Sequence, residues 1–335
     1  MAAPRISVLL PAFNASATLA SCLASLARQS EPNWECVLVD DGSCDGTADV
    51  ARAWASRDPR IQLLSRPHRG IVAALDEGLA RCRAPLVARM DADDLMRRDR
   101  VRAQADALDR DRHLAAVGCH VRLFPRAGLT PGRRAYEHWL NGLRTADDVR
   151  RDALVECPVA HPTLMMRREV LASLGYSDTS WAEDYDLVLR ALAASHAIGI
   201  VPRRLVAWRD HPGRLSRRDA RYAAERFTAC KAFHLARGFL ARTDRYVLWG
   251  YGDTGRLLRR ALLDHGRQPS HIVEVKPTRI GQRIHGAPVI APDALTTLRD
   301  RPIVVSVAHQ GPRTEIRQAL SNMGFVELRD YVCAA

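Results

Sequence analysis

Short apolar segments alternate with amphipathic ones through the first 90 residues, and this alternation constrains the fold more than any other feature. The apolar runs that predict buried strands are residues 6–10, 36–39, 61–64 and 86–90. The segments between them that predict helices are residues 17–28, 47–56 and 71–81. Strands linked in this way form a mostly parallel, doubly wound α/β sheet, which binds ligands at the carboxyl ends of its strands.

The strand–helix pattern starts again near residue 245, after a mixed middle region. Residues 245–249 predict a strand, a glycine-rich turn follows, and residues 256–265 predict a helix. The other expected strands are residues 115–123, 272–275, 303–307 and 325–332. The other expected helices are residues 100–110, 184–194 and 220–236, and residues 125–134 are expected to form an irregular link. The two expected domains are residues 1–238 and a smaller, Rossmann-like α/β domain at residues 239–335.

Composition excludes several classes of protein. Apolar residues make up 47% of the chain and charged residues 26%, so the chain is neither disordered nor fibrous. No apolar run approaches the roughly 20 residues of a membrane-spanning helix, and the first one is too short for a signal peptide. We therefore expect a cytoplasmic protein. The eight cysteines form no CxxC pair, which argues against a zinc ribbon or a disulfide framework.

The formal net charge of +12 bears on the partners. A basic surface favours anionic partners such as a nucleoside diphosphate, and it leaves open a peripheral contact with lipid phosphates at the inner face of a membrane. The basic residues are spread along the chain rather than gathered in one stripe, so no specific nucleic-acid partner is expected.

Candidate ligand-binding residues follow the first two predicted strands, at the edge of the sheet where ligands bind. Pro11, Ala12 and Phe13 come after the first strand, and Asp40 and Asp41 come after the second. A carboxylate at this edge can accept hydrogen bonds from a pyrimidine N–H or a ribose hydroxyl. The alternative is that these residues only build a turn and cap the following helix.

A denser acidic cluster, Asp91-Ala92-Asp93-Asp94, follows the fourth predicted strand. Its three carboxylates repel one another unless a cation or a hydrogen-bond donor compensates. Mg²⁺ and Mn²⁺ prefer oxygen ligands, and a cation bound at this position would neutralise a diphosphate leaving group. The alternative is an acidic helix start, where negative charge suits the helix macrodipole.

A third acidic pair, Glu183 and Asp184, begins a predicted apolar helix. One of these carboxylates can deprotonate an acceptor hydroxyl, and helix capping is the alternative. His211 precedes an arginine-rich run that either grips phosphate oxygens or forms a solvated basic face. Residues 161–167, which begin with His161, predict a strand.

Seven stretches, taken in order, resemble the family 2 glycosyltransferases, which have the GT-A fold. The stretches are residues 6–14, 36–43, 69–75, 89–94, 161–168, 183–187 and 209–211. The resemblance implies an inverting enzyme that moves a sugar from a nucleoside-diphosphate donor to an acceptor hydroxyl, with Mn²⁺ or Mg²⁺ as cofactor. A UDP-sugar is the favoured donor.

The resemblance also implies a role for each matching residue. Asp41 would contact the base, and the residues lining the nucleotide pocket with it would be Pro11, Ala12, Phe13, Asp40, Arg69, Asp91, Ala92 and Asp93. The metal site would comprise Asp93, Asp94 and His211, the last beside the diphosphate. Asp184 would be the general base, with Glu183 as its neighbour or substitute. This chain departs from the family at Phe13, where Tyr is frequent, and at Asp76, where Asn is frequent.

The resemblance further implies a hydroxyl-bearing glycan, lipid-linked or small-molecule acceptor, in the synthesis of a bacterial surface polysaccharide, glycolipid or other glycoconjugate. A non-catalytic protein that only binds sugar nucleotides is the alternative. It is disfavoured because Asp41, Asp93, Asp94 and Asp184 are all present.

The glycine turn of the C-terminal domain matches a dinucleotide-binding fingerprint at Gly250, Gly252 and Gly255. Glu274 follows the next predicted strand, at the place of a ribose-binding acid. A bifunctional enzyme with a dinucleotide-dependent C-terminal half is therefore an alternative. However, the domain is short and resembles the truncated Rossmann-like modules found beside sugar-processing enzymes. A docking or dimerisation module, which would support a homodimer, is favoured.

Overall fold

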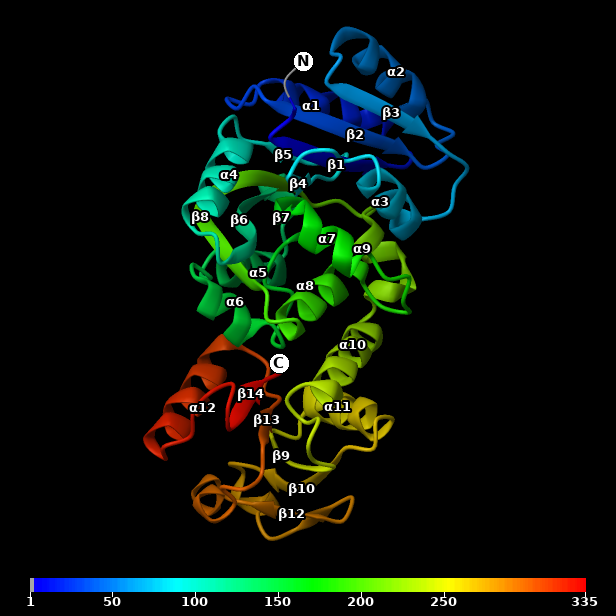
Figure 1. Cartoon of the computed structure of the whole chain (residues 1–335). Coiled ribbons are helices and arrows are strands. Elements are labelled where there is room, and N and C mark those ends of the chain that lie inside the picture. The colour runs from blue at the N-terminus through cyan, green and yellow to red at the C-terminus, as the bar shows by residue number, and fades with distance from the viewer. Residues whose placement is uncertain (1–2) are drawn as a thin grey trace. The chain divides into compact units, whose positions relative to one another are not determined.

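The computed structural model describes residues 3–335, which divide into two compact units (Figure 1). The first unit comprises the chain up to Arg150, Pro158–Thr179 and Glu183–Arg214. The second unit comprises Arg151–Cys157, Ser180–Ala182 and Leu215–Ala335. Each unit is built around its own β-sheet. The domain division expected at residue 238 stays a prediction.

The first unit is built on a mixed sheet of eight strands in the order β3-β2-β1-β4-β7-β6-β8-β5. The strands are β1 (Ile6–Ala12), β2 (Trp34–Asp40), β3 (Ile61–Ser65), β4 (Leu86–Arg89), β5 (Leu95–Met96), β6 (Leu114–Phe124), β7 (Met165–Arg167) and β8 (Ala197–Arg209). The four strands from β3 to β4 are parallel, as are β6 and β8. Strand β7 is antiparallel to both its neighbours, and β5 is antiparallel to β8. The expected doubly wound, mostly parallel α/β fold is confirmed.

Helices accompany this sheet, and the five at residues 16–27, 47–57, 71–79, 100–110 and 183–193 match the helices expected from apolar periodicity, whereas the other three were not predicted. The helices are α1 (Ser16–Ala27), α2 (Thr47–Arg57), α3 (Ile71–Leu79), α4 (Arg100–Arg110), α5 (Pro131–Leu140), α6 (Ala146–Asp152), α7 (Arg168–Leu174) and α8 (Glu183–Ala193). Helix α1 illustrates the pattern: the side chains it buries include Leu19, Cys22, Leu23 and Leu26, which share one face and join the core beneath β1 and β2.

Helix α3 lies unusually close to β1 and β2 because of Gly78. A Cβ atom at this position would lie 2.4 Å from Leu9 Cδ1 and 2.8 Å from Val39 Cγ2. A side chain here would therefore force Leu9 and Val39, or the helix itself, to shift. The close packing matters for the site, because the residues that lead into α3 contact Asp41.

Two local expectations in the first unit were wrong. Residues 125–134 contain the start of α5 rather than only an irregular link, because the Thr130 side chain accepts a hydrogen bond from the Arg133 N–H and Pro131 occupies the first helical position. Residues 161–167 begin with the 3-10 turn η2 (His161–Thr163), and only Met165–Arg167 is a strand. Pro162 has no N–H to donate to a β-ladder, which explains the delay.

The second unit contains a six-stranded sheet in the order β11-β12-β10-β9-β13-β14. The strands are β9 (Arg245–Trp249), β10 (Gln268–Val273), β11 (Arg283–Ile284), β12 (Ala287–Ile290), β13 (Ile303–Val305) and β14 (Tyr331–Cys333). Its helices are α9 (Leu215–Arg218), α10 (Ala224–Arg237), α11 (Asp253–Leu263) and α12 (Gln310–Asn322). The strands are parallel except for the β11–β12 hairpin, which gives the expected Rossmann-like arrangement.

The last expected strand, residues 325–332, is mostly a turn. Strand β14 begins only at Tyr331, because the segment before it closes on itself. The Val326 N–H donates to Asp330 Oδ2 at 2.7 Å, and the Asp330 N–H donates to the Val326 carbonyl at 2.8 Å. Within residues 3–335, no helix is both long and apolar enough to cross a membrane.

Candidate active site

Strand register brings the first two predicted loops together. Ala12 at the end of β1 lies opposite Asp40 at the end of β2, so the residues after each strand meet at one edge of the sheet. Hydrogen bonds then join the loops: the Asn14 N–H donates to Ser43 Oγ at 2.9 Å, and the Cys44 N–H donates to Asn14 Oδ1 at 3.0 Å. The two loops are therefore joined, and Pro11, Ala12 and Asp40 are buried where their strands end. A nucleotide crevice between the loops stays a prediction.

A single carboxylate, that of Asp45, anchors both helices that leave these loops. Its Oδ2 accepts hydrogen bonds from the N–H and hydroxyl of Ser16 at the start of α1, and its Oδ1 accepts from the N–H and hydroxyl of Thr47 at the start of α2. These bonds favour the charged form and lower the pKa of Asp45 to about 2, although burial opposes the shift. The two loops are thereby fixed to one another.

Asp41 is buried, and backbone N–H groups from the start of α3 orient its carboxylate. Oδ1 accepts from the Arg69 N–H at 3.1 Å, and Oδ2 accepts from the Gly70 N–H at 2.9 Å. Arg66 adds a cationic partner, with its Nε 3.3 Å from Oδ1, and His68 Nδ1 lies 2.8 Å from Oδ2. The structure thus brings together Asp41 and Arg69, two residues that the sequence singled out.

An aromatic pair stands beside Asp41. The rings of Phe13 and His68 are stacked, with centroids 4.0 Å apart and an angle of 19° between their planes. Phe13 is 46% exposed, an unusual degree for a large apolar side chain at the edge of a core. Such a surface suits the face of a planar base. Sequence reasoning found Phe13 but missed His68, because no motif marks it.

The three carboxylates of Asp91, Asp93 and Asp94 converge. One oxygen from each lies within 4.8 Å of the others. Asp94 is completely buried; its Oδ1 accepts from the Arg209 N–H at 2.6 Å, and its Oδ2 has no hydrogen-bond partner within residues 3–335. Burial and the charges of Asp91 and Asp93 raise the pKa of Asp94 well above its usual range. An orphaned, buried carboxylate oxygen among like charges fits a divalent cation.

Strand β8 supplies the support for this cluster. Arg209 Nε donates to the Asp93 carbonyl at 2.7 Å, in addition to the backbone bond to Asp94. His211, two residues further on, places its Nε2 2.8 Å from Asp93 Oδ2. The expected proximity of His211 to the acidic cluster is therefore present in the structure. Strand β8 was not predicted from the sequence, and neither was the role of Arg209.

Arg89 connects the acidic cluster to the third acidic pair. Its guanidinium is buried and forms an ion pair with Asp91 at 2.6 Å, while its Nε and Nη1 have no hydrogen-bond partner within residues 3–335. Its charge also acts on Glu183 and Asp184. Among the three clustered carboxylates, Asp91 alone forms an ion pair with an arginine within the described part of the chain. Asp93 and Asp94 are therefore left without an arginine partner in this part of the chain.

Glu183 and Asp184 begin α8, with Glu183 buried and Asp184 half-buried. Asp184 Oδ1 accepts a hydrogen bond from the Tyr185 N–H at 2.8 Å. Burial, the charge of Glu183 and, more weakly, that of Asp91 raise the pKa of Asp184 to about 7. A carboxylate with a pKa near neutrality is a stronger proton acceptor than an ordinary aspartate, as a general base requires.

His161 and Tyr176 lie behind this pair. His161 Nε2 is 3.2 Å from the Tyr176 hydroxyl, and its Nδ1 is 3.9 Å from Glu183 Oε1. Burial and the charge of Arg89 lower the pKa of His161 well below its usual value, so its imidazole is neutral. Asp76 accepts a hydrogen bond from the Tyr176 N–H at 3.1 Å, a contact that the amide oxygen of Asn also makes, so the bond does not explain the acid at this position. No sequence signal marked Tyr176.

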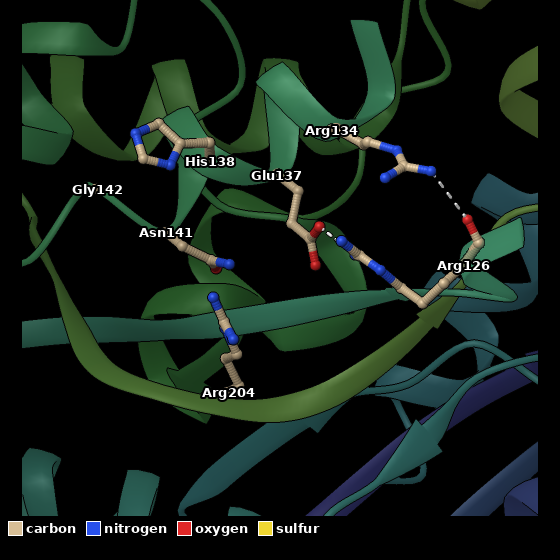
Figure 2. A pocket seen from close by; sticks show the side chains of 7 residues that line it. All are labelled: Arg126, Arg134, Glu137, His138, Asn141, Gly142 and Arg204. Carbon is tan, nitrogen blue, oxygen red and sulfur yellow. Dashed lines mark hydrogen bonds and ion pairs between the residues drawn. The ribbon is translucent and has the colours of Figure 1, made fainter. Parts of the chain in front are cut away.

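A separate pocket of about 380 Å³ lies on the first unit (Figure 2). Its lining residues are Arg126, Arg134, Glu137, His138, Asn141, Gly142 and Arg204. Arg126 pairs with Glu137, and Arg134 donates to backbone carbonyls. Because two of its three arginines already have oxygen partners, the pocket carries no functional assignment.

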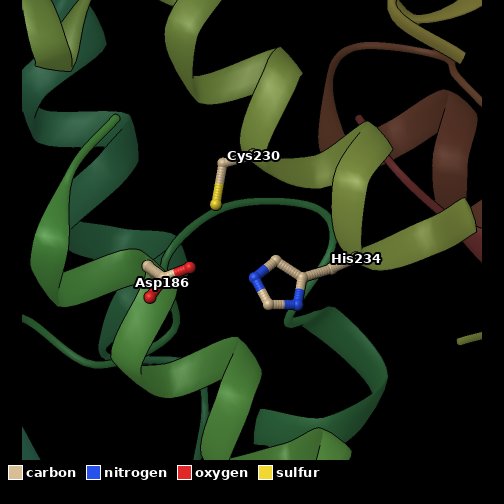
Figure 3. Close-up of side chains that lie close together, drawn as sticks. All are labelled: Asp186, Cys230 and His234. Atoms are coloured by element: carbon tan, nitrogen blue, oxygen red, sulfur yellow. The ribbon is translucent and has the colours of Figure 1, made fainter. Parts of the chain in front are cut away.

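Figure 3 draws Asp186, Cys230 and His234, whose side chains are of metal-binding types but belong to different units, so no site is assigned to them. Asp186 belongs to α8 in the first unit, and its side chain is engaged by Arg190 Nε at 2.6 Å. Cys230 and His234 belong to α10 in the second unit. The site is therefore assigned to the carboxylates of Asp91, Asp93 and Asp94, which all come from one loop of the first unit.

Two solved structures have a similar fold. TarS of S. aureus, residues 1–349 in complex with UDP-GlcNAc, aligns with a TM-score of 0.57 and 17% identity over 78% of this chain and 72% of that chain. The mannosyltransferase PcManGT of Pyrobaculum calidifontis, in complex with GDP-Man and Mn²⁺, aligns with a TM-score of 0.52 and 17% identity over 96% of this chain and 81% of that chain. The fold is therefore that of the GT-A glycosyltransferases.

Sequence comparison defines the family. The profile of glycosyl transferase family 2 matches residues 7–175, and the chain belongs to this family. EpsE of Bacillus subtilis strain 168 is 32% identical over 195 residues, which cover 56% of this chain and 66% of EpsE. The amylovoran biosynthesis glycosyltransferase AmsE of Erwinia amylovora is 29% identical over 200 residues, which cover 58% of this chain and 73% of AmsE. The expected family membership is thus confirmed.

Proposed function

We propose that this chain is an inverting, metal-dependent glycosyltransferase that moves a sugar from a nucleoside-diphosphate donor to an acceptor hydroxyl. The observation that carries the proposal is the pairing of two acidic sites through Arg89. One site, at Asp94, keeps an unpartnered buried oxygen that suits a cation; the other, at Asp184, has a pKa of about 7 that suits a base. A transferase of this kind needs both functions side by side.

The nucleotide end of the donor would bind in the crevice between the first two loops. The stacked rings of Phe13 and His68 offer a face to the base, and the buried carboxylate of Asp41 offers an acceptor for a base N–H. Strand register holds these groups in place before the ligand arrives, since Ala12 and Asp40 are paired neighbours. A UDP-sugar remains the favoured donor, and TarS was solved with UDP-GlcNAc, which is consistent with it.

The diphosphate would lie against the acidic cluster. Asp93 and Asp94 would hold a Mn²⁺ or Mg²⁺ ion, with Asp91 close by, and His211 would face the diphosphate from its place against Asp93. When bound, the ion would offset the negative charge that builds up on the departing diphosphate. Arg209 keeps the loop in position through its bonds to the backbone of Asp93 and the carboxylate of Asp94.

Transfer would proceed as a single displacement. Asp184 accepts the proton of the acceptor hydroxyl as that oxygen forms a bond to the anomeric carbon, and the bond between this carbon and the diphosphate oxygen breaks on the opposite face. The nucleoside diphosphate leaves with the electron pair, and the configuration at the anomeric carbon inverts. AmsE is named for amylovoran biosynthesis, which supports a saccharide acceptor in polysaccharide assembly.

A screen of sugar nucleotides tests the proposal. The purified chain is heated with UDP-, GDP- and dTDP-sugars, with and without Mn²⁺, and release of nucleoside diphosphate is followed in parallel. We expect one donor to raise the melting temperature more with Mn²⁺ than without it. The Asp93→Asn variant should lose this difference, whereas Asp147→Asn, on the exposed start of α6, should keep it. The proposal would be contradicted if the donor raised the melting temperature equally with and without Mn²⁺, and equally in the wild type and in Asp93→Asn.

A further inference from the structure

The glycine turn of the second unit contains two glycines that the fold itself requires. Gly250 has a φ of +95°, and a Cβ atom on it would lie 2.4 Å from Val307 Cγ2. A Cβ atom on Gly255 would lie 2.1 Å from the Gly250 carbonyl oxygen, so only glycine lets α11 pack this closely against the end of β9. Neither glycine needs a ligand to explain it.

Gly252 is different, because nothing in the fold explains its lack of a side chain. Its φ and ψ are −80° and −161°, a conformation open to any residue, and a Cβ atom on it would meet no atom within 4 Å. It precedes α11 as the N-cap, where Ser, Asn or Asp would satisfy a helix N–H that no side chain now caps. Because Gly252 has no side chain, the N–H groups at the start of α11 are left accessible to an anionic group.

A carboxylate stands at the same turn. Glu274 directly follows β10, and its Oε1 accepts hydrogen bonds from the Tyr251 N–H at 3.3 Å and from Arg279 Nη1 at 3.1 Å. The second oxygen, Oε2, has no hydrogen-bond partner within residues 3–335. An acid at the end of the second strand of such a unit accepts hydrogen bonds from ribose hydroxyls.

A buried hydroxyl without a partner lies on the other side of the turn. Ser306 is 2% exposed, and its Oγ has no hydrogen-bond partner in the described part of the chain. Its N–H donates to the Trp249 carbonyl, and its own carbonyl accepts from Thr254 Oγ1 in the first turn of α11, so the residue flanks the glycine turn. A buried polar atom left unpaired is costly, which points to an occupant that the fold itself does not supply.

We propose that the second unit binds a nucleotide carrying a diphosphate at this turn. Glu274 would hold the ribose hydroxyls, and the N–H groups at the start of α11, which Gly252 leaves uncovered, would hold the diphosphate, with Ser306 alongside. The turn lies between β9 and β13, where the strand order reverses and where open parallel sheets bind ligands. This site is separate from the transferase site in the first unit and stands without it.

Calorimetry on the full chain tests the proposal with NAD⁺, NADP⁺, ADP and UDP, and with inorganic pyrophosphate as a probe without ribose. We expect at least one nucleotide to bind, and Gly252→Val to weaken that binding by about tenfold or more. Gly132→Val, at another glycine with open space, is the matched control in the first unit and should leave the binding unchanged. Glu274→Gln should weaken binding of the nucleotide but not of pyrophosphate, because the N–H groups of α11, and not Glu274, would hold the diphosphate.

Variants of the first unit separate the two sites. Binding at the turn should persist in Phe13→Ala, which removes the exposed ring from the other nucleotide crevice. The proposal is overturned if no nucleotide binds in a way that responds to Gly252→Val, or if all binding disappears in Phe13→Ala. Circular dichroism checks that each variant folds, and Gly252→Ala replaces Gly252→Val if the larger side chain disturbs the unit.

Discussion

The guanidinium of Arg89 lies 2.6 Å from Asp91 Oδ1, and its charge also reaches Asp184. One buried cation therefore touches the acidic cluster and influences the acid that begins α8. Arg89 lowers the pKa of Asp184, whereas burial and the neighbouring Glu183 raise it more strongly. The balance leaves Asp184 ready to exchange a proton near neutral pH, which is the basis of the first two predictions.

The Asp184→Asn variant should lose sugar transfer while it keeps nucleotide binding. The amide has nearly the same shape as the carboxylate and still accepts the Tyr185 hydrogen bond, but it cannot take a proton. We expect kcat to fall by about 10²–10⁴. Single-turnover transfer and calorimetric donor binding, measured on the same preparation, check this. Equal losses in both would instead assign Asp184 a purely structural role.

The pH profile of transfer should have an acidic limb set by Asp184. Only the deprotonated carboxylate acts as a base, so kcat/KM should drop as the pH falls below about 7. The Glu183→Gln variant removes the neighbouring negative charge that helps to raise the pKa of Asp184. The acidic limb of the pH profile of this variant should therefore move to lower pH. A limb that stays in place, or moves to higher pH, would contradict this assignment.

The Asp94→Asn variant should melt at a higher temperature than the wild type when no metal is present. The pKa of Asp94 is raised in the folded state, so its protonated form stabilises the fold and this contribution is lost as the pH rises through the folded-state pKa. The gain from the amide should be largest at neutral to alkaline pH and should vanish below about pH 4, the ordinary range of an aspartate pKa. Thermal melts across pH measure it.

Addition of Mn²⁺ provides the control for that prediction. The ion should stabilise the wild type and leave Asp94→Asn nearly unaffected, which narrows or reverses the order of the two melting temperatures. If Mn²⁺ stabilised both proteins equally, the ion would bind at a site that does not include Asp94.

The Phe13→Ala variant should weaken donor binding without changing stability. The ring is 46% exposed and stacks on His68, so its removal opens no cavity in the core. A stacking contact contributes about 0.5–1.5 kcal/mol, so the dissociation constant should rise by roughly two- to tenfold. Calorimetry with the donor gives the affinity, and an unchanged affinity would show that the base binds elsewhere.

The Gly78→Ala variant should destabilise the first unit, although alanine is the better helix former. Helix propensity alone favours the change by about 1 kcal/mol. The new methyl group would lie 2.4 Å from Leu9 Cδ1, however, and overpacking of this kind costs about 1–3 kcal/mol. Urea denaturation should show a net loss of stability. Higher stability would mean that α3 can move away from the sheet at little cost.

Local patterns were enough to predict the β1–β4 half of the large sheet. Its strands are short, apolar and separated by well-formed helices, so periodicity alone locates them. Strand β8 escaped prediction because Pro202 and the adjacent arginines interrupt its apolar pattern, and its pairing with β6 contains register shifts. Such a strand is stabilised by long-range pairing rather than by its own sequence.

The candidate site likewise has a part that could be predicted from the sequence and a part that could not. The acids at strand ends could be predicted because the end of a parallel strand is a fixed place in the fold. The contacts of His68, Tyr176 and Arg209 could not, because each arises from tertiary packing between segments distant in the sequence. Arg89 was visible in a matching stretch, but its ion pair with Asp91 and its electrostatic reach to Asp184 depend on burial that only the folded chain provides.

The bonds of Asp45 to the starts of both α1 and α2 have a consequence for how such a protein can diversify. Because one carboxylate holds both helix starts, neither of the two loops proposed to bind the nucleotide can lengthen or move without releasing the other. New donor preferences are then most accessible through exchange of individual side chains on a fixed frame. Variation in loop length is left to parts of the molecule that do not share this anchor.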